Sequence, residues 1–429
     1  MNDLMISIVF GIVFFILIML SVALHEVGHL LPAKRFGVRV SQYFVGFGPT
    51  LWSFKRGETE YGLKWVPLGG YVRLLGMYPP SKDKAEKSRL EAMADEAREV
   101  EWDEITETDV LDKRLVYQKK TWQKIVIMFG GPCVNLVIAF LLFWGVAGIF
   151  GSWQTTTGVA AVQPCVILEA GRDQCLDTDP KSPASEAGLL AGDTIVSFNG
   201  TEIANRELLV KLIRENLDGE ARITVDRNGQ RVELVPVHTL IVDGNPELTS
   251  SQVVPIGYLG FTAATEHVTG GPVEVFGQMW EMTKQSYVAL VQLPANVWKV
   301  FSDIITGQER SQDSPMSIFG ASVVAGEVAA ADNVGVGAKV ALFASLLGSL
   351  NLFLALLNLI PLPPLDGGHI AGAIYEGLRR RLAKLRKLPD PGPVDTAKLL
   401  PLTYIVAGFL LICGVALILA DIISPVRLF

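Results

Sequence analysis

Two histidines and a glutamate near the start of the chain have the spacing of a zinc site. His25-Glu26-Val27-Gly28-His29 is an HExxH motif. On a helix its two histidines lie four residues apart on one face, where both imidazoles can bind one metal ion, with Glu26 beside it as general base. A chance match is the alternative, but such polar residues are costly at the edge of an apolar helix unless they face a cavity and bind something. The motif therefore predicts a metal site.

A catalytic zinc has three protein ligands and one open position, so a third ligand must come from elsewhere in the chain. The segment 358–369 reads Asn-Leu-Ile-Pro-Leu-Pro-Pro-Leu-Asp-Gly-Gly-His and follows a late apolar run. Its prolines break the helix and its glycines let the backbone approach closely, so the Asp366 carboxylate can be aimed sideways. His369 is the rival ligand, and we favour Asp366.

Four apolar runs must position these residues. The chain has 429 residues, of which 50% are hydrophobic and 19% charged, with a mean hydropathy of +0.36. This composition excludes a single soluble globule. Residues 4–24, 125–168, 340–365 and 399–420 lack Asp, Glu, Lys and Arg, and each holds an apolar run near the roughly 20 residues that a spanning helix needs. The first run lacks the basic start and the cleavage site of a signal peptide, so we interpret it as a retained span.

The positive charges predict the orientation of the spans, since Lys and Arg near span ends are retained in the cytoplasm. They gather between the first two runs, for example Lys34, Arg35 and Lys124, and again over 379–387. Both termini and residues 155–335 are therefore expected outside. The first and third spans then run in the same direction, which brings the HExxH motif and Asp366 to the same side of the membrane.

The net charge of the chain is −7, so nucleic acid is not expected as a partner.

HExxH in a first span together with NxxPxPxLDG in a later one resembles the site-2 protease family of intramembrane zinc metalloproteases. Bacterial members that cleave anti-sigma factors are similar along nearly the whole chain. Carried over position by position, the resemblance implies His25, His29 and Asp366 as zinc ligands and Glu26 as catalytic acid and base. It also implies that Asn358 lies near the substrate.

Residues 129–135, Phe-Gly-Gly-Pro-Cys-Val-Asn, resemble the FNGPxxN motif of the same family, with Gly130 in place of the usual Asn. Two roles remain open for this motif. It forms either a tight helix start that packs closely or a part of the catalytic site.

The segment 46–76 predicts a β-hairpin, because residues alternate through 51–54 and 61–65 around a turn at 56–58. In the family a matching segment re-enters the membrane and offers a strand edge to substrate, which implies Gly69, Gly70 and Tyr71 as substrate-binding residues. Pairing with a strand edge would hold a substrate helix extended for cleavage. The residues alone equally allow a surface hairpin without a substrate role.

Residues 182–203 resemble the bacterial PDZ pattern SPAxxAGLxxGDxIxxxNGxxI. Asn199-Gly200 is a hairpin turn signal, residues 205–217 predict the helix beside a PDZ groove, and 221–237 predict the next hairpin. A PDZ domain takes a peptide as an added strand, or here filters substrates by the size of their outer portion. Both roles stay open.

Of the four cysteines, Cys165 and Cys175 share one polar segment and form the candidate disulfide. Cys133 and Cys413 lie in apolar runs, as small hydrophobic residues do.

Residues 81–112 are rich in charge and predict a solvated helical or partly disordered insertion. Apolar residues at helical spacing over 276–291 predict an amphipathic helix, either on the outer membrane face or packed on the PDZ domain. Residues 314–320 are expected to form a loop.

Together these patterns predict an α-helical polytopic membrane protein of about four transmembrane helices, with a membrane-associated β-hairpin and an inserted extracytoplasmic PDZ (α+β) domain. The predicted parts are 1–80 (first transmembrane helix and re-entrant hairpin), 81–120 (charged cytoplasmic insertion), 121–152 (second transmembrane helix), 153–268 (PDZ domain), 269–338 (amphipathic helix and loop at the outer face), 339–370 (third transmembrane helix with the LDG motif), 371–398 (basic cytoplasmic loop) and 399–429 (fourth transmembrane helix and tail).

The predicted function is a zinc-dependent (Zn²⁺) endopeptidase that cleaves within the spans of single-span membrane proteins. The resemblance implies a bacterial cytoplasmic membrane, an active site toward the cytoplasm, and substrates such as anti-sigma factors or leftover signal peptides. The expected partners are these substrates, a peptide or substrate ectodomain at the PDZ domain, and the lipid bilayer. Two other classes of protein are the alternatives: a metal transporter or zinc-dependent scaffold, and a PDZ-bearing pseudoenzyme. The spans carry almost no further His or acidic residues for transport, and no ligand is missing.

Overall fold

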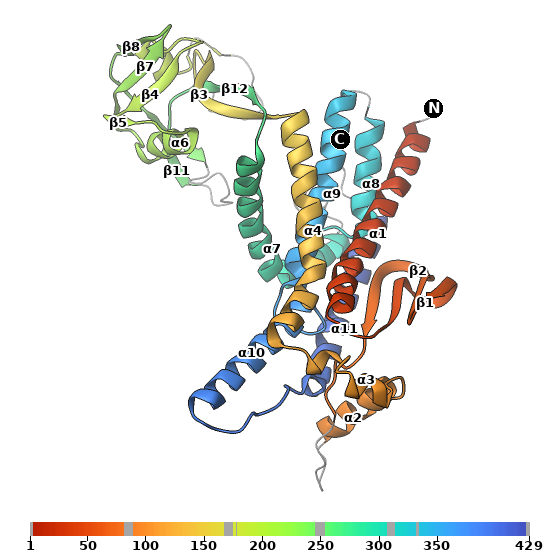
Figure 1. Ribbon diagram of the computed structural model, residues 1–429. Coiled ribbons are helices and arrows are strands. Elements are labelled where there is room, and N and C mark those ends of the chain that lie inside the picture. Colours follow the sequence, from red (N-terminus) through yellow and green to blue (C-terminus); the bar gives the residue numbers. More distant parts are fainter. Residues whose placement is uncertain are drawn as a thin grey trace. The chain divides into compact units, whose positions relative to one another are not determined.

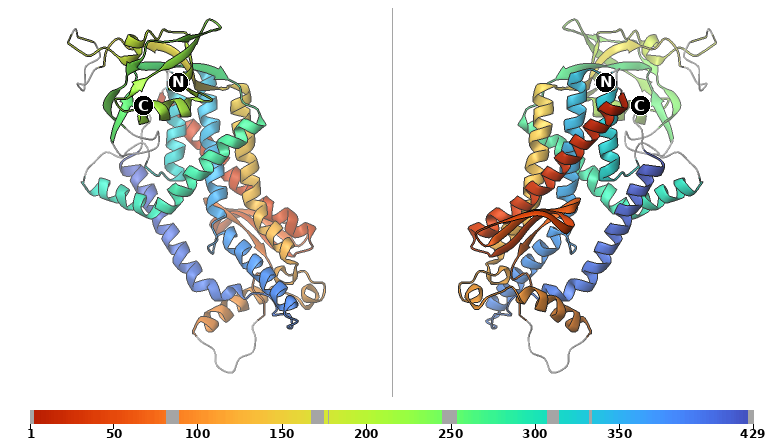
Figure 2. Two further views of the ribbon diagram at one scale, coloured as in Figure 1. Left: turned by 90° about the vertical axis from the view of Figure 1, so that its left-hand side faces the viewer. Right: turned by 90° about the vertical axis from the view of Figure 1, so that its right-hand side faces the viewer.

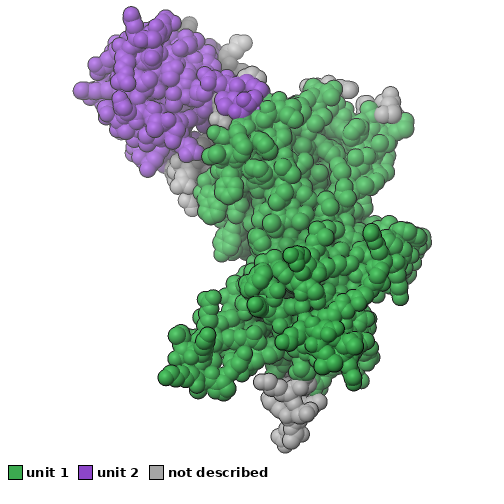
Figure 3. All heavy atoms as spheres, viewed as in Figure 1, with its two compact units in different colours: residues 1–150, 270–429 green, residues 151–269 purple. Residues whose placement is uncertain are grey.

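The computed structural model describes residues 3–80, 89–166, 175–176, 178–244, 254–306, 314–331 and 334–425. The chain divides into two compact units (Figure 3). Unit 1 consists of Met1–Phe150 and Gly270–Phe429, and unit 2 of Gly151–Thr269. Unit 1 holds the chemistry-bearing motifs, and unit 2 holds the segment with the PDZ pattern.

Four helices of unit 1 are long and apolar enough to cross a membrane, as the composition predicts. They run over Leu4–Arg35, Thr121–Ile149, Val336–Asn358 and Thr396–Ile423. In chain order these are α1 (Asp3–Arg35), α4 (Thr121–Ile149), α9 (Val336–Asn358) and α11 (Leu400–Ile423). The fourth also includes the short helix η2 (Thr396–Leu399), which directly precedes α11. Helix α4 packs against both α1 and α9 (Figure 1). The four spans predicted from the sequence are confirmed as four apolar helices.

Two glycines let α1 and α4 cross in backbone contact. A Cβ atom built on Gly28 would overlap the carbonyl oxygen of Gly130, and a Cβ on Gly130 would overlap the carbonyl oxygen of Gly28. Any larger side chain at either position would push the helices apart. Gly130 is therefore a close-packing residue in this chain.

The predicted hairpin is longer than expected and folds back on itself. Strands β1 (Val40–Arg56) and β2 (Thr59–Leu74) pair over their whole length. Residues 42–45 of β1 pair with 70–73 on one side and with 60–63 on the other. Gly46 and Gly69 adopt φ of +90° and +88°, which allows the strands to bend there. The stretch 70–74 is left as an edge of this small sheet, which packs against α1 (Figures 1 and 2).

The charge-rich insertion is helical in its described part, which is one of the two forms that the sequence left open, and it is docked on the rest of unit 1. Its described part forms α2 (Arg89–Trp102), α3 (Glu107–Leu111) and the short helix η1 (Val116–Gln118); the expectation for residues 81–88 lies outside the described residues. Ala94 is fully buried against Leu400. The buried Glu101 carboxylate accepts hydrogen bonds from the backbone N–H groups of Met77 (2.8 Å) and Tyr78 (3.1 Å). The composition predicted the helices but not their docking, because partners for charges such as Glu101 lie elsewhere in the chain.

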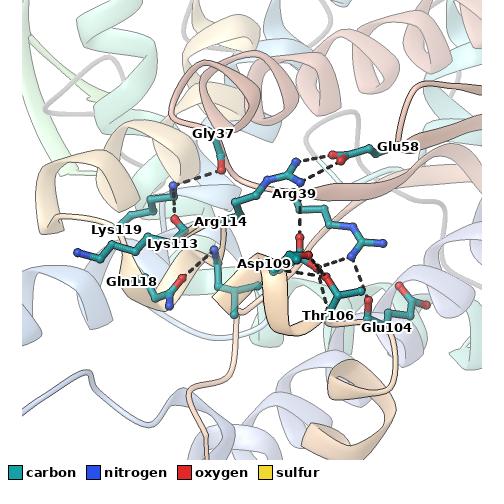
Figure 4. A network of polar contacts seen from close by, with 12 residues as sticks. Gly37, Arg39, Glu58, Glu104, Thr106, Asp109, Lys113, Arg114, Gln118 and Lys119 are labelled. Carbon is teal, nitrogen blue, oxygen red and sulfur yellow. Dashed lines mark hydrogen bonds and ion pairs between the residues drawn. The ribbon is translucent and has the colours of Figure 1, made fainter. Parts of the chain in front are cut away.

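A polar network fastens the insertion to the end of α1 and to the tip of the hairpin (Figure 4). Arg39, just after α1, pairs with the buried Asp109, and Arg114 pairs with Glu58 at the hairpin tip. Lys119 donates to the Phe36 carbonyl oxygen at 2.7 Å. Burial alone would raise the pKa of Asp109, but hydrogen bonds from Thr106 and Arg39 outweigh it and lower that pKa. The carboxylate thus stays charged and holds Arg39.

Two further helices follow unit 2 in the chain, and the sequence predicted only one of them. Helix α7 (Pro272–Thr306) packs through Val275 and Met279 against Phe143 of α4. The sequence left open whether α7 lies on the membrane face or on the PDZ domain. These contacts of α7 are with α4, one of the four long apolar helices.

Residues 318–330 form α8 (Ile318–Ala330) against α1, where only a loop was expected. Asp421 accepts a hydrogen bond from the Ser317 N–H at 2.7 Å, at the start of α8.

The third span ends earlier than its sequence motif. Helix α9 stops at Asn358, and a new helix, α10 (Asp366–Leu385), begins at the LDG aspartate after a connection rich in proline. Residues 339–370 are therefore two helices joined by a turn, and much of the expected basic loop 371–398 is helical. Three prolines within four residues, Pro361, Pro363 and Pro364, favour the break, because each lacks the backbone N–H that a helix interior needs.

Unit 2 is built on a six-stranded sheet, in which β12-β3-β4-β7-β8 follow one another and β5 pairs with β4. The bounds are β3 (Ser152–Val162), β4 (Thr194–Phe198), β5 (Thr201–Glu202), β7 (Ile223–Arg227), β8 (Gln230–Glu233) and β12 (Phe261–Val268), with the smaller pairs β6 (Glu220–Ala221) with β9 (Val237–His238) and β10 (Leu240–Gly244) with β11 (Val254–Tyr258). Helices α5 (Pro183–Ala187) and α6 (Arg206–Glu215) complete the unit. Phe198, Leu209 and Ile223 are buried in its core, and Cys165 and Cys175 form a disulfide with their Cα atoms 5.9 Å apart.

Candidate metal centre

Three side chains from two distant parts of the chain meet in unit 1. His25 and His29 lie one turn apart on α1, and Asp366 is the first residue of α10. The Nε2 atoms of the two histidines are 3.2 Å apart. Asp366 Oδ2 lies 3.3 Å from Nε2 of His25 and 3.4 Å from Nε2 of His29. The structure therefore brings together the three residues that the sequence motifs singled out.

This triangle has the size that a zinc ion requires. Ligand atoms around a tetrahedral zinc, with bonds of about 2.0–2.1 Å, lie about 3.3 Å from one another. The Oδ2 atom of Asp366 is buried and has no hydrogen-bond partner among the described residues. Two imidazole nitrogens and one carboxylate oxygen thus present lone pairs to a single point, where a cation relieves their mutual repulsion. The donor set and its dimensions fit Zn²⁺.

Helix α4 fixes the orientation of His29 and leaves room for the triangle. His29 Nδ1 lies 2.8 Å from the carbonyl oxygen of Ile127, so Nδ1–H donates there and the lone pair of Nε2 is left for a metal. A Cβ atom on Gly131 would overlap Nε2 of His29 and lie 2.6 Å from Nε2 of His25. Sequence reasoning missed both contributions of α4. The paired glycines of residues 129–135 were the available signal.

Asp366 is aimed by the glycines that follow it. A Cβ atom on Gly367 would overlap the carbonyl oxygens of Leu359 and Ile360, and one on Gly368 would lie 2.6 Å from the backbone nitrogen of Pro363. The start of α10 therefore packs directly on the connection from α9. A carboxylate in the first turn of a helix is also favoured by the helix dipole.

A cavity of about 520 Å³ opens onto the triangle. Its walls come from α1, the edge stretch of the hairpin, α4, and the end of α9 with the start of α10. The side chains or backbone of Glu26, Gly69, Gly70, Tyr71 and Asn358 all line it. A Cβ atom on Gly70 would lie 3.2 Å from Cγ of Glu26, so the hairpin edge and the glutamate are in close proximity.

Two more polar residues line the same cavity. His369 lies outside the triangle of ligand atoms, and its imidazole can form a hydrogen bond inside the cavity. Asn135, from the motif of residues 129–135, is buried, and its Oδ1 atom has no hydrogen-bond partner among the described residues. That amide is available to a polar group inside the cavity.

Comparisons with known proteins agree with this geometry. Residues 13–388 match the family described as Peptidase family M50. The chain is 35% identical to zinc metalloprotease Rip1 of Mycobacterium tuberculosis, with 98% of each chain covered. It is 36% identical to Rip1 of Mycobacterium bovis and 33% identical to Rip1 of Mycolicibacterium smegmatis, again over 98% of each chain. Each of these relatives is named as a zinc metalloprotease.

Proposed function

The chain belongs to peptidase family M50 and is a zinc metalloprotease, and on that premise we propose that it cuts peptide bonds inside the spanning segments of single-span membrane proteins. The observation that carries the proposal is the triangle of His25, His29 and Asp366 at the wall of a cavity between apolar helices. A soluble substrate does not require a site built on helices of this length and hydropathy. A spanning segment of another protein does.

We assign the zinc to His25, His29 and Asp366, and the acid–base chemistry to Glu26. Bound zinc supplies Lewis acidity, which favours loss of a proton from water and polarises a carbonyl oxygen. Glu26 takes a proton from the attacking water and returns it to the nitrogen of the leaving amine as the peptide C–N bond breaks. His29 is held for this task by its hydrogen bond to the Ile127 carbonyl oxygen.

The hairpin edge is suited to present the substrate. A peptide bond in an intact helix has its carbonyl oxygen engaged, so a substrate helix must open locally before it is cut. The edge stretch 70–74 lies at the cavity and offers backbone groups for a further strand. We propose that Gly69, Gly70 and Tyr71 hold the opened substrate there, and that Asn358 contacts it from the end of α9.

The proposed cellular setting follows from the charges and the disulfide. Positive residues after α1 and over 379–387 favour a cytoplasmic side for the metal centre in a bacterial cytoplasmic membrane. Unit 2 would then be extracytoplasmic, where a disulfide between Cys165 and Cys175 is chemically stable. Anti-sigma factors and leftover signal peptides are the substrate types that this arrangement suits.

Unit 2 is proposed to be a PDZ domain. Its helix α6, its turns at Asn199-Gly200 and Asn228-Gly229, and its Greek-key-like strand order support this assignment. We propose that it receives a peptide or the ectodomain of a substrate. A filter that admits only substrates with a short outer portion is the second role consistent with such a domain.

The test is cleavage of a full-length single-span substrate in liposomes by the native protein and by Glu26→Gln. We expect a product cut within the span from the native protein only, while the variant keeps its zinc, because the glutamate is not one of the ligands. Glu202→Gln, an exposed carboxylate of unit 2, serves as control and should cleave normally. Equal product from native protein and Glu26→Gln, or loss of zinc in that variant, would contradict the assignment.

A further inference from the structure

Helix α10 carries an apolar stripe on its exposed side. Its large apolar side chains are each between 44% and 79% exposed, namely Ile374, Tyr375, Leu378, Leu382 and Leu385. Successive residues of a helix are rotated by about 100°, so these side chains share one face. The buried residues Ala373 and Glu376 lie on the opposite face, where α10 packs against α4. The stripe therefore points away from the rest of unit 1.

The stripe lies close to the end of a span. Helix α9 ends at Asn358 and α10 begins at Asp366, so a short connection keeps the start of α10 beside the boundary that α9 would reach in a membrane. The second half of α10 extends away from α4 (Figure 1). A helix with an exposed apolar stripe at such a boundary can lie in the interface, with that stripe among the acyl chains.

Cations flank the stripe on both sides. Arg381 lies seven residues after Ile374, and Arg386 lies eleven residues after Tyr375. At about 100° per residue, each cation is within about 20° of one edge of the stripe. The apolar stem of an arginine can follow the stripe while its guanidinium group stays at the polar surface. This pattern is typical of a helix that lies in the plane of a membrane surface.

The exposed cations at this end of α10 have no carboxylate partner in the described part of the chain. They are Arg381, Lys384, Arg386 and Lys387. The described ion pairs of α10 after Asp366 use Glu376 and Arg380 instead. A cluster of this kind directly after a span attracts anionic headgroups.

We propose that α10 binds anionic phospholipids at the membrane surface. The stripe contacts acyl chains, and the guanidinium groups of Arg381 and Arg386 donate hydrogen bonds to phosphate oxygens. An anionic phospholipid supplies an apolar chain and a negative charge in one molecule, which matches the stripe and its flanking cations together. The inference rests on α9 spanning a membrane and is independent of proteolysis.

The experiment places a fluorescent probe on the stripe. Leu382→Cys is made in a protein whose free cysteines, Cys133 and Cys413, are replaced by Ala, and it is labelled with nitrobenzoxadiazole. The protein is reconstituted into vesicles of phosphatidylcholine, alone or mixed with phosphatidylglycerol. Part of the phosphatidylcholine carries a doxyl quencher on its acyl chain. The matched control carries the probe at Lys384→Cys, on the opposite face of the same helix.

We expect the lipid quencher to act on the stripe. In the mixed vesicles, quenching at position 382 should exceed quenching at position 384 by about threefold or more. It should also exceed quenching at 382 in phosphatidylcholine alone by about twofold or more. Equal quenching at the two positions would overturn the proposal, as would equal quenching in the two lipids. A blue-shifted but unquenched probe at 382 would place protein on the stripe, such as a second copy, and would also overturn it.

A charge reversal tests the headgroup contacts. With the probe at 382, Arg381→Glu combined with Arg386→Glu should abolish the extra quenching that phosphatidylglycerol causes. Lys211→Glu combined with Arg222→Glu changes two exposed residues of unit 2 by the same charge and should keep it. An unchanged lipid dependence in the α10 variant contradicts the proposal, provided that circular dichroism shows a folded protein. Glu26→Gln should behave as the native protein, which separates this result from failure of the protease assignment.

Discussion

At the scale of single residues, the two histidines of the proposed metal centre are constrained by a neighbour that has no side chain. Gly131 of α4 faces both Nε2 atoms, and Ile127, one turn earlier, accepts the hydrogen bond from His29. The close approach of α4 thus constrains the two histidine Nε2 atoms. The proposed ligand pair on α1 gains its geometry from the backbone of α4.

Gly131→Ala is therefore expected to lose zinc although it changes no ligand. Its methyl group would overlap Nε2 of His29 and crowd Nε2 of His25, which forces the imidazoles out of position. We expect zinc binding to weaken by about tenfold or more, measured by elemental analysis of the purified protein. Gly145→Ala is the matched control on α4, because nothing lies within 4 Å of a Cβ atom there. A fully zinc-loaded Gly131→Ala protein would show that this glycine does not shape the site.

At the scale of elements, α10 must hold Asp366 in place, and a buried ion pair ties it to α4. Lys124 Nζ lies 2.9 Å from Oε1 and 3.0 Å from Oε2 of Glu376 on α10, and both side chains are buried. Glu376 also accepts the Val394 N–H at 3.1 Å and lies 3.3 Å from Arg380. Since Glu376 and Asp366 share α10, this pair supports the proposed third ligand from ten residues away.

Glu376→Ala should consequently destabilise unit 1 and reduce proteolysis. It leaves the Lys124 ammonium group buried without its carboxylate, which costs about 3–5 kcal/mol. Lys124→Met should cost less, because Glu376 keeps Arg380 and the Val394 N–H. Thermal unfolding of the two variants measures the difference, and the double variant with Met at both positions should recover part of the loss. An unchanged melting temperature for Glu376→Ala would mean that the pair does not anchor α10.

At the scale of the whole molecule, the two units depend on different interactions. Unit 1 contains the proposed metal centre and packed apolar helices, whereas unit 2 has its own core and an ion pair between the buried Asp193 and the partly exposed Arg227. Asp193 of unit 2 accepts two hydrogen bonds of 2.7 Å from Arg227 and one of 2.9 Å from the Leu190 N–H. The hydrogen bonds from Arg227 lower the pKa of Asp193.

This lowered pKa predicts an acid-sensitive unit 2. The unfolded chain binds a proton at Asp193 at higher pH than the folded chain does. The pair therefore stabilises the fold above about pH 4, the ordinary Asp pKa, and this stability is lost as the pH falls through the folded pKa. Hydrogen exchange at Ile195 and Val225 between pH 7 and pH 3 measures the effect. Asp193→Asn should lose protection at pH 7 and show a weaker acid dependence, whereas Asp218→Asn, at an exposed residue, should match the native protein. Parallel pH profiles for all three proteins would contradict the prediction.

The sequence by itself determined the features that depend on neighbouring residues. Apolar runs gave the four long helices, the i, i+4 spacing put His25 and His29 on one face, and Asn-Gly pairs marked turns of unit 2. These signals are local, because hydrophobic length, helical period and turn preference are properties of a few consecutive residues. The motif of residues 358–369 also located the acidic residue that completes the triangle.

Only the tertiary structure decided the features that depend on distant residues. Sequence reasoning missed the fold-back of the hairpin, the docking of α2 and the existence of α8. It also missed the close approach of Gly131 to Nε2 of both histidines. In each case a charged, short or glycine-containing segment is shaped by partners far away in the chain, such as Met77 and Tyr78 for Glu101. The free energy of those contacts appears only when the partners meet, so no local pattern records it.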